Sequence, residues 1–126
     1  LLAERLNQPG IAGMTARPAS FTPTTSKYQG KICHGIQIHV LDRAIFHPIQ
    51  AALDIITSCQ ELFPYDFKFL PPSNQADPRP HFDLLAGSDK LRQAIVAGQS
   101  VEQITTGWQP DLEEFEKRRK PYLRYD

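Results

Sequence analysis

The sequence predicts an α+β fold, in which a small mixed sheet packs against helices. Three observations predict it. Residues 36–40 alternate apolar and polar side chains with the period of a strand. Residues 46–63 carry apolar side chains at the i, i+3, i+4 spacing of a helix packed on a sheet. Helix-capping signals then recur along the second half of the chain.

The first third of the chain predicts a helix end, a strand and a loop. Leu1–Asn7 is typical of the last turns of an amphipathic helix, and Met14–Phe21 of a strand. Pro18 interrupts that strand and suits an edge position, because proline cannot donate a ladder hydrogen bond. Residues 22–31 are rich in hydroxyl groups and should form a loop, in which Gly30 can adopt a positive φ.

The second predicted strand has two unlike faces. Alternation places Ile36, Ile38 and Val40 toward the core, because successive side chains of a strand point to opposite faces. Gln37 and His39 should then lie together on the other face.

The predicted helix from Phe46 to Phe63 should cover one side of the sheet. Pro48 suits its first turn and Pro64 ends it. Its expected buried stripe contains Ile49, Ala52, Leu53, Ile56, Cys59 and Phe63.

The second half of the chain predicts mainly helices. A short strand is expected at 67–70, before a proline-rich loop at 71–80, and another at 122–125. The expected helices run from Ser88 to Ala97 with Gly98 just after the end, from the capping box Ser100–Gln103 to about Thr106, and from Leu112 to Arg119.

Length and charge set outer limits. The 126 residues suit a single domain, 1–126, and 14 basic residues balance 14 acidic ones. No overall field therefore attracts nucleic acid, and no apolar run approaches the length of a membrane span. The opening residues look like the middle of a protein, so we expect a piece of a longer one.

Polar side chains concentrate between Ser20 and Arg43. Hydroxyl, amide and imidazole groups suit the hydroxyls of a sugar, and a lysine or arginine can pair with a ligand carboxylate. The residues expected to bind substrate are Ser26, Lys27, Tyr28, Gln37 and His39.

Catalytic alternatives fit this stretch poorly. Cys33, His34, His39 and Asp42 match no zinc-binding spacing, and His34 and His39 should lie on opposite faces of the strand. Nothing local activates Cys33 as a nucleophile. Acidic side chains fall mostly on exposed helical faces, without the apolar burial that raises the pKa of a catalytic carboxyl. We expect no metal, no cofactor and no catalytic acid within this chain, although a metal-dependent hydrolase using His34, His39 and Asp42 is an alternative.

Several separated motifs carry a resemblance. They are FTPTTSKYxGKxCxGIQIHVxDR from Phe21, FDLLAGSDKLRxAIxAG from Phe82, WQPDLExF from Trp108 and RKPYLxY near the end. In this order they resemble the C-terminal part of the bacterial DUF1343 family, which is similar to the exo-β-N-acetylmuramidases.

The resemblance implies an auxiliary domain of a two-domain hydrolase. The partner would be the protein's own N-terminal Rossmann-like domain, which carries the catalytic glutamate, and the active site would lie in the cleft between the two. The ligand would be a muropeptide or another peptidoglycan-derived sugar, and Lys27 would lie near the lactyl carboxylate of N-acetylmuramic acid. Cell-wall turnover favours a periplasmic or secreted location over a cytoplasmic one. The rival interpretation is a non-catalytic interaction or dimerisation module.

Overall fold

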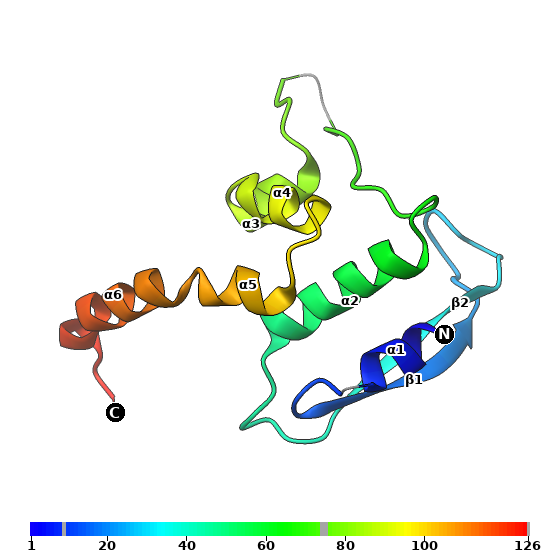
Figure 1. Cartoon of the computed structure of the whole chain (residues 1–126). Helices are drawn as coiled ribbons and strands as arrows, with labels where there is room; N and C mark the ends of the chain where they lie inside the picture. The colour runs from blue at the N-terminus through cyan, green and yellow to red at the C-terminus, as the bar shows by residue number, and fades with distance from the viewer. Residues whose placement is uncertain (9, 74–75, 126) are drawn as a thin grey trace. The chain divides into compact units, whose positions relative to one another are not determined.

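The computed structural model describes residues 1–8, 10–73 and 76–125 (Figure 1). The chain divides into two compact units, Leu1–Lys68 and Phe69–Asp126. The prediction of one domain spanning 1–126 stays a prediction.

The first unit joins a β-hairpin to two helices. The strands pair antiparallel, with Met14 opposite Val40 at one end and Phe21 opposite Cys33 at the other. The α+β class is confirmed, and the sheet of the described residues is two-stranded and antiparallel rather than mixed. The elements are α1 (Leu2–Asn7), β1 (Met14–Phe21), β2 (Cys33–Val40) and α2 (Pro48–Leu62).

The short helix α1, and not α2, is the main cover of the sheet. Ala3 and Leu6 of α1 pack with Met14 and Ala16 of β1, and Ala51 of α2 completes this core. Figure 1 shows α1 lying along the hairpin. The prediction that the long helix does most of the covering was therefore wrong, because the buried side chains of α1 occupy the space over β1.

The Asn7 side chain ties the end of α1 to β1. Its Nδ2 donates to the Ala16 carbonyl at 2.8 Å, and its Oδ1 accepts from the Ala16 N–H at 2.9 Å. The side-chain amide thus pairs with β1 as a neighbouring strand would, at the edge that β2 leaves unpaired.

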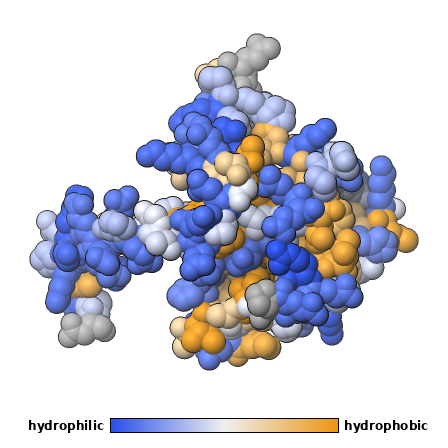
Figure 2. Space-filling view, viewed as in Figure 1, coloured by the Kyte–Doolittle hydropathy of each residue, from blue (hydrophilic) through white to orange (hydrophobic). Residues whose placement is uncertain are grey.

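Two expected core residues of β2 are exposed. Ile36 packs against the core, but Ile38 is 44% and Val40 45% exposed. The physical reason is size: α1 is about 9 Å long and covers mainly β1, so β2 is left as an edge. Figure 2 shows that the face of the molecule in view is largely hydrophilic, with several apolar patches.

The long helix has Pro48 in its first turn as predicted, but its buried face is rotated relative to the predicted buried stripe. Ala51 and Ser58 are buried and Leu53 is 2% exposed, whereas Ile49 is 63% exposed. Ala52, another expected member of the buried stripe, is also exposed.

The backbone around Gly13 holds the hairpin to the segment that leads into α2. The Gly13 carbonyl accepts from the N–H groups of Leu41 and Asp42, at 2.8 and 3.1 Å. Gly13 has φ +73°, and a Cβ there would lie 2.5 Å from the Asp42 carbonyl oxygen and 2.9 Å from the Phe46 nitrogen. Only glycine fits this position without strain.

The second unit is helical throughout its regular structure. The capping box of Ser100 and Gln103 is confirmed, and Gly98 adopts φ +73° after the preceding helix. Ile95, Val101 and Ile104 form its buried apolar residues. The elements are α3 (His81–Ala86), α4 (Lys90–Val96), α5 (Val101–Thr106), α6 (Gln109–Arg119) and the 3-10 turn η1 (Lys120–Tyr122).

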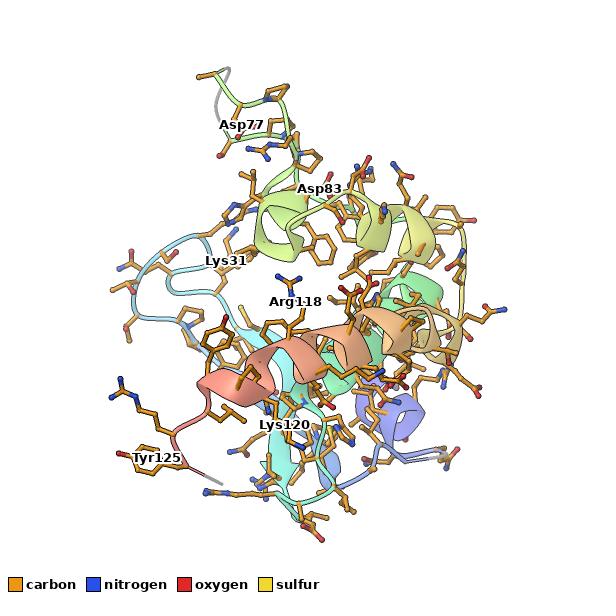
Figure 3. All side chains as sticks on the ribbon, turned by 90° about the vertical axis from the view of Figure 1, so that its left-hand side faces the viewer. Lys31, Asp77, Asp83, Arg118, Lys120 and Tyr125 are labelled. Atoms are coloured by element: carbon orange, nitrogen blue, oxygen red, sulfur yellow. The ribbon has the colours of Figure 1, made fainter. Side chains whose placement is uncertain are left out.

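A buried ion pair links α3 to α4. Asp83, labelled in Figure 3, is 3% exposed. It accepts two hydrogen bonds from the Arg92 guanidinium, at 2.7 and 2.8 Å. Hydrogen bonding to Arg92 lowers the pKa of Asp83 below its usual value. Each oxygen of the Asp83 carboxylate accepts a hydrogen bond from Arg92, so this ion pair has a structural role.

Two predicted strands were wrong, and α3 was not predicted. Residues 67–70 have no regular structure and follow a turn at 64–66, which the Phe67 N–H closes by donating to the Phe63 carbonyl at 2.8 Å. The Phe69 ring packs on Phe82, with centroids 4.8 Å apart, instead of joining a sheet. Residues 120–122 form η1 in place of a strand at the end. Among the described residues, no helix combines the length and apolarity needed to cross a membrane.

Candidate functional site

The Ser26–Tyr28 segment lies in the loop that joins the two strands. Ser26 adopts φ 71°, unusual for a residue with a side chain, and its carbonyl accepts from the Gln29 N–H at 3.1 Å. The Lys27 ammonium lies 5.7 Å from the centre of the Tyr28 ring, within the range of a cation–π contact. All three side chains are exposed and can meet a ligand.

The strand register places Gln37 and His39 on one face, as predicted. Gln37 lies opposite Arg17, and His39 opposite Thr15. The Arg17 guanidinium donates to Gln37 Oε1 at 2.9 Å. Sequence reasoning missed Arg17 and Thr15, although they alternate with the buried Met14 and Ala16 and so could have been placed on this polar face.

His39 is only partly accessible. Its Nε2 is buried and has no hydrogen-bond partner within the described part of the chain. A ligand on this face can therefore contact the ring only through its other edge.

The predicted binding residues do not converge on one point. The loop follows the Phe21–Cys33 end of the hairpin, whereas His39 lies six residues along β2 from Cys33, which is about 20 Å in a strand. Gln37 lies between the two. These residues line a strip along the hairpin instead of a compact pocket.

Two residues of the alternative metal site, His34 and Asp42, form hydrogen bonds to other groups. His34 Nδ1 forms a 2.8 Å hydrogen bond with the Ser20 hydroxyl on the face opposite to His39. Asp42 Oδ1 accepts from the Ala44 N–H at 2.8 Å and stabilises a turn. No group of three or more His, Cys, Asp or Glu side chains that could hold a metal occurs among residues 1–8, 10–73 and 76–125.

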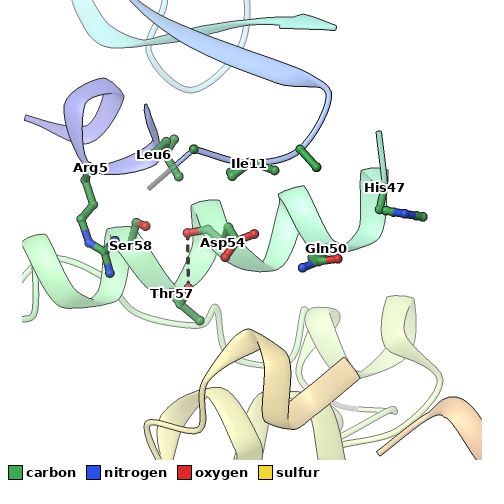
Figure 4. A pocket seen from close by; sticks show the side chains of 10 residues that line it. Arg5, Leu6, Ile11, His47, Gln50, Asp54, Thr57 and Ser58 are labelled. Atoms are coloured by element: carbon green, nitrogen blue, oxygen red, sulfur yellow. Dashed lines mark hydrogen bonds between the residues drawn. The ribbon is translucent and has the colours of Figure 1, made fainter. Parts of the chain in front are cut away.

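A groove that sequence reasoning missed lies between α1 and α2. Its volume is about 340 Å³, and Figure 4 shows Arg5, Leu6 and Ile11 lining it opposite Asp54 and other α2 side chains. The described residues that line it are Arg5, Leu6, Gly10, Ile11, Ala12, His47, Gln50, Asp54, Thr57 and Ser58.

Asp54 is a partly buried carboxyl in this groove. Desolvation by burial raises the pKa of its carboxyl above the usual value, and the positive charge of Arg5 opposes that shift. Arg5 itself donates to Glu61 Oε2, from its Nη2 at 2.8 Å and its Nε at 3.3 Å. A signal was present in the sequence: His47, Gln50 and Asp54 follow a helical spacing of three and four residues.

The comparisons with known proteins agree on a class. The model of the C-terminal domain of the exo-β-N-acetylmuramidase NamZ matches residues 1–125. The chain therefore belongs to the NamZ C-terminal domain family.

One curated relative and one solved structure support this placement. The chain is 43% identical over 124 residues to the peptidoglycan β-N-acetylmuramidase NamZ of Bacillus subtilis (strain 168), covering 98% of the chain and 28% of that protein. A crystal structure of a DUF1343 family protein from Bacteroides fragilis matches with a TM-score of 0.81 at 22% identity, over 99% of this chain and 32% of that one. The chain thus spans about a third or less of either protein, and the crystal structure supports the fold alone.

Proposed function

We propose that this chain is the substrate-binding C-terminal domain of a peptidoglycan β-N-acetylmuramidase that releases N-acetylmuramic acid from non-reducing ends. The observation that carries the proposal is the family match along residues 1–125. The identity of 43% to a protein with this printed activity supports it. The catalytic acid is expected in another part of the longer protein, where a two-domain Rossmann-like hydrolase would carry it.

The hairpin supports a binding role for the residues expected from the sequence. Ser26, Lys27 and Tyr28 are exposed in its loop, and Gln37 and His39 lie on its polar strand face. The Lys27 ammonium and the Arg17 guanidinium are two cations on this strip, and either can pair with the lactyl carboxylate of N-acetylmuramic acid. In this proposal the strip forms one wall of the substrate cleft and orients the sugar for cleavage.

A chimera tests the proposal directly. This chain would replace the matched 124 residues of the Bacillus subtilis relative, and hydrolysis of a chromogenic N-acetylmuramic acid glycoside would be measured. We expect activity well above that of the relative truncated before those residues. A chimera that is folded but no more active than the truncated protein would contradict the proposal and favour the interaction or dimerisation module.

Lys27→Ala in the active chimera tests the assigned contact. Loss of a charge-assisted hydrogen bond should raise KM about 10-fold. Lys68→Ala, which removes a lysine of the same unit outside the hairpin, is the matched control and should leave KM unchanged. Equal KM values for the two variants would show that Lys27 does not contact the substrate.

A further inference from the structure

We propose that the groove between α1 and α2 binds a small, uncharged polyhydroxylated molecule of about one sugar ring, held by Arg5, Gln50 and Asp54. The groove shares no residue with the hairpin strip, so this proposal goes beyond the muramidase function and does not depend on it.

The size and walls of the groove suit such a ligand. Its volume of about 340 Å³ is at the lower end of the range for small-molecule sites, roughly 300–1,000 Å³. Leu6, Ile11 and Ala12 line it with apolar surface, while α2 supplies polar side chains. A sugar ring presents both kinds of surface, apolar C–H groups on its faces and hydroxyls around its edge.

Three polar side chains that α2 and its N-cap residue contribute to this groove are open to a ligand. In the part of the chain that the structure describes, the side chains of His47, Gln50 and Asp54 form no hydrogen bond. Thr57, by contrast, donates to the Leu53 carbonyl at 2.9 Å. His47 and Gln50 are exposed and Asp54 is partly buried, so all three side chains are free to form hydrogen bonds with a ligand in the groove.

Charge selects the kind of ligand. Glu61 forms a salt bridge with the Arg5 guanidinium, whereas no described residue forms one with the Asp54 carboxylate. An anionic ligand would be repelled by Asp54. Hydroxyl groups can donate to the Asp54 carboxylate and accept from the remaining N–H groups of Arg5 and the Gln50 amide.

The experiment is a titration of the isotopically labelled 126-residue chain, followed by backbone amide chemical shifts. The probes are glucose and N-acetylglucosamine, which are uncharged, and glucosamine, which carries an ammonium group. We expect the two neutral sugars to shift amides of 10–12 and 47–58 with a dissociation constant in the millimolar range. Asp54→Asn and Gln50→Ala should each raise that constant about 5-fold or more.

Two control variants separate this proposal from the others. Asp66→Asn removes an exposed carboxylate beyond the end of α2 and should change nothing. Lys27→Ala should leave these shifts intact, so a failure of the hairpin proposal and a failure of the groove proposal give different results. Asp54→Asn keeps the shape of the side chain and removes a partly desolvated charge, so the variant should fold.

Three results would overturn the proposal. One is the absence of groove shifts with either neutral sugar at tens of millimolar. Another is a response to glucosamine alone, which would show an ammonium site. The third is a set of groove shifts that neither Asp54→Asn nor Gln50→Ala weakens.

Discussion

The hairpin strip and the α1–α2 groove are both rich in polar side chains, but they differ in how those side chains are used. On the hairpin strip, Arg17 and Gln37 bond to each other. The groove has apolar walls, and Gln50 and Asp54 line it without a hydrogen-bond partner among the described residues. Polar residues that are adjacent in sequence therefore need not converge in space, whereas residues spaced along a helix can.

The largest expected effect comes from Gly13→Ala, which should damage both regions. The added Cβ would overlap the Asp42 and Phe46 backbone, and alanine disfavours φ +73°. We expect the free energy of unfolding to fall by about 3 kcal/mol or more, measured by urea denaturation.

Gly30→Ala is the matched control for that prediction. Gly30 has the same φ of +73° in the same unit, but apart from Gly30 and its two chain neighbours no atom of the described residues lies within 4 Å of the position that its Cβ would take. It should lose only about 1 kcal/mol, for the left-handed conformation itself. Similar losses for both variants would show that the close contacts around Gly13 do not matter.

Asn7→Ala should weaken the groove more than the hairpin strip. It removes both hydrogen bonds between the end of α1 and Ala16, and we expect a loss of about 1.5 kcal/mol in the free energy of unfolding. The groove wall formed by α1 should loosen, which hydrogen exchange of Leu6 would detect. Gln8→Ala, at an exposed neighbouring position, should have little effect, and equal effects of the two would argue against the Asn7 tie.

Asp83 and Asp54 should give opposite pH dependence. The pKa of Asp83 is lowered, so its contribution to stability is present above the unfolded value of about 3.9 and is lost as the pH falls through the lowered pKa. The pKa of Asp54 is raised, so its contribution is present below the unfolded value and is lost as the pH rises through the raised pKa.

Urea unfolding at acidic and neutral pH tests this pair. At neutral pH, Asp83→Asn should lower the free energy of unfolding and Asp54→Asn should raise it. The single tryptophan, Trp108, belongs to the second unit, so its fluorescence follows the unit of Asp83, and far-UV circular dichroism follows both. Destabilisation by Asp54→Asn would mean that its carboxylate is a structural group and would weaken the contrast with Asp83.

The smallest expected change in stability is that of Gln37→Ala. Its bond to Arg17 is exposed, so the free energy of unfolding should change by less than about 0.5 kcal/mol. Binding of N-acetylmuramic acid, measured by calorimetry, should nevertheless weaken about 5-fold. Arg17→Ala breaks the same bond but keeps the Gln37 amide; if both variants bind as well as the unaltered chain does, Gln37 is not a ligand contact.

Much of the local structure could be predicted from the sequence. Both strands, the start of α2 at Pro48, and the capping box at Ser100 depend on alternation, on the fixed φ of proline and on a cap that reaches only three residues. The failures at 67–70 and 122–125 have a common cause: a strand needs a partner, and a short apolar run does not say whether one is there.

Part of the candidate site on the hairpin could also be predicted from the sequence, and part could not. Alternation placed Gln37 and His39 on one face, and the register confirmed it. The pairing of Gln37 with Arg17 depends on the neighbouring strand, which the alternation of β2 alone does not specify. The alternation also does not show that His39 Nε2 is buried.

By itself, the sequence determined the α+β class, the family resemblance and the polar face of the hairpin, because these depend on local periodicity and on the order of motifs. The tertiary structure decided that α1 covers β1, that Ile38 and Val40 are exposed, and that Arg5 and Asp54 line one groove. Arg5 and Asp54 are far apart in the chain, and only the packing of α1 against α2 brings them to the same groove and partly desolvates the Asp54 carboxylate.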